Sequence, residues 1–171
     1  LSRDAEQIRN AEKVILPGVG AAKPAMKALA SYGLDKVVTE LRQPVLGVCL
    51  GMQLMCAHSE EGDTDCLGIF DLPVLRFEEK EKVPHMGWNT VSQGKHPLWN
   101  GIADETRFYF VHSYHVKAEN EEQVKGRGHY GVDFAAAMGQ DNVFAVQFHP
   151  EKSHNAGLAL LKNFLNWDGQ S

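Results

Sequence analysis

The chain has 171 residues, 43% of them hydrophobic, and a formal net charge of −5 at pH 7. This length suits one domain with a sizeable core, so a single domain over residues 1–171 is expected. The 17 Lys and Arg residues are scattered along the chain, which excludes the basic surface of a nucleic-acid-binding protein. No apolar run approaches the roughly 20 residues that cross a bilayer, and the N-terminus lacks a signal-peptide pattern. We therefore expect a cytoplasmic protein whose partners include neither a nucleic acid nor a membrane.

The cysteines are few and have no metal-binding spacing. Cys49, Cys56 and Cys66 form no CxxC pair, so the sequence predicts neither a disulfide framework nor a zinc site. We expect reduced thiols, no bound metal and no cofactor.

The first part of the chain alternates strand patterns with helical patterns. A short helix near the N-terminus precedes a buried strand at residues 12–16, and a Gly-rich turn leads to a helix that starts at Pro24 and breaks near Gly33. A second buried strand is predicted at residues 43–48, followed by a helix of about ten residues that ends by Gly62. Strands joined by helices pair in parallel.

From Leu67 onward the pattern becomes β-rich, with short apolar stretches separated by Gly, Pro, Asn and Asp. The stretches lie at residues 67–77, 85–91, 107–116, 133–139 and 143–148. Their short connections favour antiparallel or mixed pairing. The C-terminal segment predicts an amphipathic helix with Leu158, Leu161, Phe164 and Leu165 on one face. The sequence therefore predicts an α/β fold with a mixed, mostly parallel central sheet flanked by helices.

Cys49 stands in the spacing G-x-C-x-G, between a predicted strand and a predicted helix. This spacing resembles a nucleophile elbow, in which the glycines relieve the crowding of a sharp turn. At a helix N-terminus the peptide dipoles favour a thiolate, and the Leu50 amide can face a developing oxyanion. The alternative is a buried structural cysteine beside helix-packing glycines. Cys56 and Cys66 are predicted to be core residues.

A thiolate nucleophile needs a base, and His149 is the best-placed of the eight histidines because it follows a predicted strand and precedes Pro150. Glu151 can turn back towards the imidazole, fix its tautomer and leave the other ring nitrogen for the sulfur. Taken alone, His149 fits a surface or capping role better. Together with Cys49 after another strand, the His-Pro-Glu segment favours a Cys-His-Glu triad.

Two further features allow more than one interpretation. The loop "LPGVG" at residues 16–20 offers backbone amides for an oxyanion, or is an ordinary tight turn, and it lacks the third glycine of a dinucleotide-binding fingerprint. Aromatic residues cluster at residues 85–89 and 108–114. Most of them are expected in the core, whereas Trp88, beside Gly and Asn, is a candidate partner contact.

These motifs resemble the class I, triad-type glutamine amidotransferases, a family with a flavodoxin-like architecture. The stretches "LPGVG", "GVCLGMQLM", "SEEG", "PHMGWN", "FYFVHSY" and "VQFHPEKS" stand in the family's order and cover nearly the whole chain. G-x-C-x-G-x-Q with a later H-P-E is specific to the class. "PGVG" with "HMGWN" and "YFVHSY" narrows the resemblance to the histidine-pathway branch, the glutaminase subunits of imidazole glycerol phosphate synthase.

The resemblance implies that the chain hydrolyses glutamine to glutamate and ammonia through a cysteinyl thioester. The ammonia would pass to a barrel-shaped partner, the synthase (cyclase) subunit, which makes imidazole glycerol phosphate in histidine biosynthesis. Cys49 would be the nucleophile, His149 the base and acid, and Glu151 the orienting carboxylate. The resemblance further implies oxyanion donors at Leu50 and the Val19–Gly20 peptide, substrate contacts at Gly18, Gln53, Glu61, Ser113 and Tyr114, and partner contacts at Trp88, Tyr109 and Lys152.

The chain departs from the family pattern at its N-terminus. The family begins with a strand, a loop containing Gly and Asn, and a helix before the segment that opens this chain, so the resemblance implies an N-terminally incomplete domain. Two alternatives to the synthase subunit remain: the glutaminase domain of another class I amidotransferase, and a non-catalytic module that kept the fold.

Overall fold

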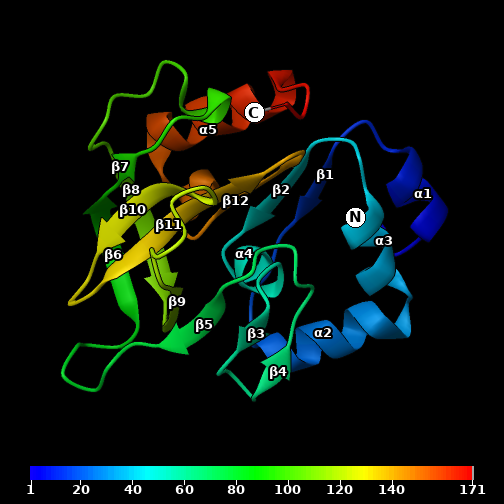
Figure 1. Cartoon of the computed structure of the whole chain (residues 1–171). Helices are drawn as coiled ribbons and strands as arrows, with labels where there is room; N and C mark the ends of the chain where they lie inside the picture. The colour runs from blue at the N-terminus through cyan, green and yellow to red at the C-terminus, as the bar shows by residue number, and fades with distance from the viewer. Residues whose placement is uncertain (171) are drawn as a thin grey trace.

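Two strands that are buried at every position lie at the centre of the computed structural model, which describes residues 1–170 (Figure 1). β2 (Val45–Val48) and β12 (Val143–Val146) are continuous apolar runs, as expected for strands covered on both faces. They pair in parallel with each other, and β1 (Val14–Leu16) pairs in parallel with the other edge of β2.

The other elements surround this parallel part. The helices are α1 (Ala5–Asn10), α2 (Ala22–Ser31), α3 (Leu34–Glu40), α4 (Leu50–Leu54) and α5 (His154–Asn166), with the 3-10 turns η1 (Pro97–Trp99) and η2 (Pro150–Lys152). The remaining strands are β3 (His58–Ser59), β4 (Thr64–Asp65), β5 (Pro73–Arg76), β6 (His85–Thr90), β7 (Ser92–Gln93), β8 (Arg107–His112), β9 (Tyr114–Val116), β10 (Val124–His129) and β11 (Asp133–Gln140). Among residues 1–170, no helix has the length and apolar character needed to cross a membrane.

The central sheet has six strands in the order β1-β2-β12-β11-β10-β7. Its pairings from β12 through β11 and β10 to β7 are antiparallel, because short hairpin loops rather than helices connect β10, β11 and β12. The predicted α/β fold with a mixed sheet is confirmed. Within the central sheet the parallel pairings are confined to β1, β2 and β12, which is a smaller share than expected.

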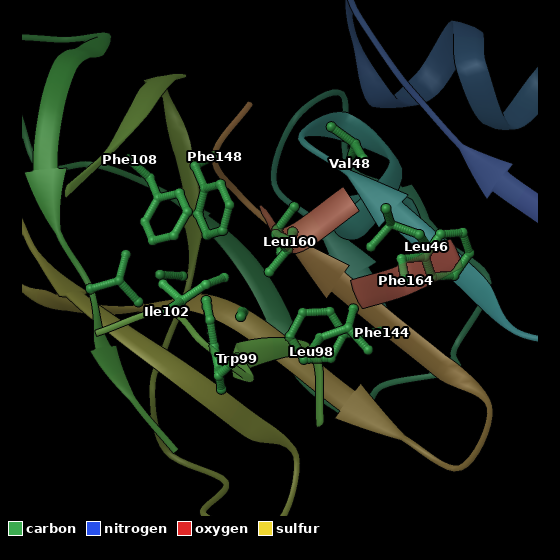
Figure 2. Packing of buried hydrophobic residues seen from close by; sticks show 14 of the residues in the cluster. Leu46, Val48, Leu98, Trp99, Ile102, Phe108, Phe144, Phe148, Leu160 and Phe164 are labelled. Carbon is green, nitrogen blue, oxygen red and sulfur yellow. The ribbon is translucent and has the colours of Figure 1, made fainter. Parts of the chain in front are cut away.

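Alternate residues of the central strands face opposite layers of the fold. Leu46 and Phe144 pack against Leu160 and Phe164 of α5 in one hydrophobic cluster (Figure 2). On the opposite face Val45 packs with residues of α3 and α4 in a second cluster. The sheet is thus sandwiched between helices, and the carboxyl ends of β1, β2 and β12 remain open for a site.

Two smaller sheets complete the fold. The sheet that contains β5 and β9 packs in the cluster of α3 and α4, whereas the pair β6–β8 packs in the cluster of α5 through Phe108 and Phe110. One has the order β4-β3-β5-β9, and the other is the antiparallel pair β6–β8. The chain passes from β8 to β9 through Ser113, whose carbonyl oxygen accepts the Phe77 amide at 3.1 Å. The change of sheet at Ser113 places the end of β8 beside the open ends of the parallel strands.

The predicted ten-residue helix after Cys49 is wrong in length, since α4 ends at Leu54. The carbonyl oxygens of residues 54–56 accept backbone hydrogen bonds from residues 67–70 instead. These tertiary contacts replace the next helical turn and leave Cys56 fully buried beyond the helix end.

The predicted apolar face of α5 is wrong at Leu158 and Leu165, which are each 64% exposed. The buried side consists of Gly157, Leu160 and Phe164. A Cβ at Gly157 would lie 1.8 Å from the Pro150 carbonyl oxygen, so the glycine must face η2 and this contact sets the rotation of the helix.

Candidate functional site

The turn at Cys49 has the backbone of a nucleophile elbow. Cys49 adopts φ 55° and ψ −112° between β2 and α4, a conformation that is strained for a residue with a side chain. A Cβ at Gly51 would lie 1.9 Å from the Leu16 carbonyl oxygen, and one at Gly18 would lie 2.7 Å from Leu50 Cβ. The glycines therefore allow α4 and the "PGVG" loop to approach each other closely around the cysteine.

Cys49 opens into a cavity of about 380 Å³, a size typical of small-molecule sites. Residues from the ends of β1, β2, β8 and β12 line it together with the 58–65 hairpin. The lining residues are Gly18, Val19, Gly20, Cys49, Leu50, Gln53, Glu61, Pro84, Val111, His112, Ser113, Tyr114, His149 and Lys152.

The Cys49 thiol is held in its neutral form. It donates to the Val111 carbonyl oxygen at 3.8 Å, and the Gln147 amide donates to the sulfur at 3.9 Å. Burial raises the pKa of Cys49 to about 11, against the opposing effect of the Leu50 amide. The expected net stabilisation of a thiolate is therefore wrong for this conformation, because burial outweighs the Leu50 amide, which does lower the pKa.

His149 is held by contacts on its side chain and on its backbone. Its Nδ1 lies 2.6 Å from Glu151 Oε1, the contact expected from the spacing. The His149 backbone amide donates to the Tyr109 carbonyl oxygen at 2.9 Å, and the Ser153 hydroxyl donates to the His149 carbonyl oxygen at 2.6 Å. The Tyr109 amide in turn donates to Ser153 Oγ at 3.0 Å. His149 is only 9% exposed. Because Nδ1 makes the contact with Glu151, Nε2 is the ring nitrogen that remains for another partner.

The polar side chains on the cavity wall are tied to neighbouring elements. Gln53 Nε2 donates to the Tyr114 carbonyl oxygen at 3.0 Å and to Gln147 Oε1 at 2.9 Å. Glu61 Oε1 accepts the Ala22 amide, at the start of α2, at 2.7 Å. Both side chains are therefore fixed by hydrogen bonds to neighbouring elements.

The "PGVG" loop is exposed where it borders the cavity. Val19 is 88% exposed. Gly20 has φ 97°, and a Cβ built on it would have no neighbour within 4 Å. The Val19–Gly20 peptide thus lies at the cavity mouth with little packing to hold it.

The three residues assigned to a partner gather beside the cavity. Trp88 is 44% exposed, stacks on His154 at 5.2 Å and meets Tyr109 edge-on at 5.9 Å. Lys152 also lines the cavity, a position that the sequence did not predict.

The sequence did not predict several residues that the structure places at the site. Pro84, Val111 and His112 line the cavity, and Gln147 links Gln53 to the Cys49 sulfur. A signal existed for Gln147, because an amide within the apolar run "VFAVQF" needs buried hydrogen-bond partners.

Comparison with known proteins assigns the family. The model of the family described as glutamine amidotransferase class-I matches residues 2–167. Imidazole glycerol phosphate synthase subunit HisH 1 of Pseudomonas aeruginosa is 53% identical over 99% of this chain and 85% of its own length. The HisH subunit of Neisseria meningitidis serogroup A is also 53% identical, over 98% of this chain and 84% of the relative.

Solved structures share the fold at lower identity. A glutamine amidotransferase crystal structure has a TM-score of 0.70 and 21% identity, covering 96% of this chain and 83% of that one. The glutaminase domain of Trypanosoma brucei CTPS with bound acivicin has a TM-score of 0.67 and 17% identity, covering 96% of this chain and 75% of that one. With the fold, the matched family and the similarity over nearly its whole length in agreement, this chain belongs to the class-I glutamine amidotransferases and, among them, to the HisH subunits of imidazole glycerol phosphate synthase.

Proposed function

We propose that this chain, as one domain, hydrolyses the side-chain amide of glutamine and passes the ammonia to the cyclase subunit of imidazole glycerol phosphate synthase, for histidine biosynthesis. The observation that carries the proposal is the meeting of the strained Cys49 turn and the Glu151-bound His149 on one cavity. The 53% identity to HisH subunits over nearly the whole chain supports the partner.

In the first step the Cys49 sulfur attacks the amide carbon of glutamine. Because the pKa of the thiol is about 11, its proton must leave during the attack, and His149 Nε2 accepts it. Glu151 holds the opposite ring nitrogen, which fixes the tautomer that can accept a proton and stabilises the imidazolium.

The carbonyl oxygen becomes an oxyanion in the tetrahedral intermediate. Leu50 and the Val19–Gly20 peptide are the proposed amide donors, and one such donor is worth on the order of 100-fold or more in rate. The freedom at Gly20 lets that peptide turn its amide towards or away from the oxyanion.

Collapse of the intermediate breaks the carbon–nitrogen bond. The His149 imidazolium gives its proton to the departing nitrogen, which leaves as ammonia, and a thioester on Cys49 remains. A water molecule that gives a proton to the same imidazole then attacks the thioester, and glutamate and the thiol are released.

Substrate recognition is assigned to the fixed polar groups of the cavity wall. The Glu61 carboxylate suits the α-ammonium group of glutamine, and the Gln53 amide suits a polar group of the substrate. Gly18 and the backbone of Ser113 and Tyr114 complete the proposed substrate contacts.

Trp88, Tyr109 and Lys152 are proposed to meet the cyclase, because they form the rim next to the cavity. Aromatic side chains of this kind commonly anchor protein interfaces. We also propose a cytoplasmic location, since the three free cysteines suit a reducing compartment.

The test is glutamine hydrolysis by the chain together with its cyclase subunit and the cyclase's nucleotide ligand. Cys49→Ala should abolish glutamate release, and Glu151→Gln should lower turnover less than Cys49→Ala does. Cys66→Ala, which alters a thiol outside the cavity, is the matched control and should hydrolyse glutamine normally. Release of glutamate by Cys49→Ala would refute the assigned nucleophile. If glutamine is hydrolysed only with the synthase partner of another class I amidotransferase, the chain is instead the glutaminase of that other enzyme.

A further inference from the structure

Two buried histidines form a pair at the cavity wall, where His112 lines the cavity, and the reaction above leaves both without a role. His85 of β6 and His112 of β8 stand opposite each other in the strand pairing and are 4% and 5% exposed. Their rings meet through His85 Nδ1 and His112 Nε2, 2.9 Å apart. The His85 ring is stacked between the rings of Phe110 and Tyr130, and the His112 ring contacts Phe110 at a tilt. Apolar side chains would fill this space without desolvation cost, so the pair calls for an explanation.

The direction of each hydrogen bond follows from the neutral state of the two rings. Burial lowers the pKa of His85 to about 4 and that of His112 to about 3. His112 Nδ1 lies 2.8 Å from the Tyr114 carbonyl oxygen, which can only accept, so Nδ1 carries the hydrogen. His112 Nε2 must then accept from His85 Nδ1, and His85 Nε2 faces the Asn89 amide at 3.4 Å. Each ring uses its δ nitrogen as a donor.

The pair ends on a group that also holds Gln53. The Tyr114 carbonyl oxygen accepts from His112 Nδ1 and from Gln53 Nε2. The same Gln53 nitrogen donates to Gln147 Oε1, and the Gln147 amide reaches the Cys49 sulfur. A buried series of hydrogen bonds therefore runs from the His85 ring to the cysteine.

We propose that His85 and His112 are positioning residues of the glutaminase site, which as a hydrogen-bonded pair fix the Tyr114 carbonyl and thereby the orientation of the Gln53 amide towards glutamine. This inference rests on the proposed function, because it takes Gln53 to be a substrate contact. Neither histidine touches the reacting atoms. Their effect should appear in glutamine binding, and therefore in KM, more than in kcat.

The choice of variants follows from the δ-nitrogen donors. Asn places its amide nitrogen on Cγ, where histidine carries Nδ1, so His112→Asn keeps the donor to Tyr114. His112→Leu removes it, and His112→Gln moves the amide one bond further away. The matched control is His115→Phe, because His115 is 4% exposed and stacks on Phe77, but its Nδ1 has no partner among the described residues.

The experiment measures KM and kcat of the chain in complex with the cyclase, and glutamine affinity by calorimetry in the Cys49→Ala background. His112→Leu should raise KM and Kd about tenfold, which equals about 1.4 kcal/mol, and lower kcat less than threefold. His112→Asn should stay within threefold of the unaltered chain. His85→Leu should raise KM about threefold, since His112 keeps its contact with Tyr114.

Four results would overturn the inference. An unchanged KM in His112→Leu removes the positioning role, and an unchanged KM in His85→Leu removes the part assigned to His85. If His112→Asn or His115→Phe raises KM as much as His112→Leu does, the effect comes from loosened packing and not from the hydrogen bond to Tyr114. If His112→Leu does not fold, His112→Gln replaces it with the same expected KM. Failure of the unaltered complex to hydrolyse glutamine would instead refute the proposed function.

Discussion

Mild acid should destabilise the folded chain through His112. Burial lowers the pKa of this side chain to about 3, the Tyr114 carbonyl opposes the shift, and charge on His85, His115 or His149 adds to it. In the unfolded chain the pKa of histidine is near 6.5. Between pH 3 and pH 6.5 the unfolded state therefore binds more protons than the folded state, and the free energy of unfolding falls as the pH falls through this range.

The size of the effect follows from these two pKa values. Between pH 7 and pH 5 the protonated fraction of this histidine rises from about a quarter to nearly all in the unfolded chain, and stays near zero in the folded one. The free energy of unfolding should fall by about 2 kcal/mol from this side chain alone. That loss is large against the roughly 5–15 kcal/mol that stabilise a typical domain.

Urea unfolding followed by tryptophan fluorescence at pH 7 and at pH 5 measures the effect. His112→Asn replaces the titrating ring with a neutral amide, so the unaltered chain should lose about 2 kcal/mol more than the variant on acidification. Equal losses in the two proteins would refute the assignment of a strongly lowered pKa to His112.

Three other predictions concern the backbone and the thiol of the site. Gly157→Ala would place a Cβ 1.8 Å from the carbonyl oxygen of Pro150, the residue after His149. Glutamine turnover should therefore fall at least tenfold, with the helix content retained in circular dichroism, and normal turnover would contradict the packing of α5 on η2. Gly51→Ala would place a Cβ 1.9 Å from the Leu16 carbonyl oxygen and should cost about 1–3 kcal/mol in urea unfolding, which a variant of normal stability would disprove. Because burial raises the pKa of Cys49 to about 11, alkylation of this thiol by iodoacetamide should be slow at pH 7 and rise about tenfold per pH unit; a rate that levels off below pH 9 would exclude such a pKa.

Some differences between expectation and structure have one cause, namely backbone contacts between distant segments. The helix after Cys49 is short because residues 67–70 take up the carbonyl groups that its next turn would use. The strand β10 (Val124–His129) was missed because its Lys, Arg and glycines give no apolar alternation, yet pairing with β7 and β11 makes it a strand. Local patterns do not contain the partners that decide such segments.

The sequence by itself determined the central strands, the turn at Cys49 and the contact between His149 and Glu151. Apolar runs long enough only for buried strands, glycines at fixed offsets from a cysteine, and a proline next to a histidine are local signals whose physical meaning does not depend on distant residues. The family resemblance rests on the same motifs, and the comparisons with known proteins agree with it.

Only the tertiary structure decided the properties that arise from burial and from pairing between distant residues. Burial keeps the Cys49 thiol neutral although its place before a helix favours a thiolate. The pairing of β6 with β8 brings His85 to His112, and the contact of α5 with η2 at Gly157 turns Leu158 outward. A pKa, a hydrogen-bond direction and the rotation of a helix depend on what surrounds a side chain, and those surroundings exist only once the chain has folded.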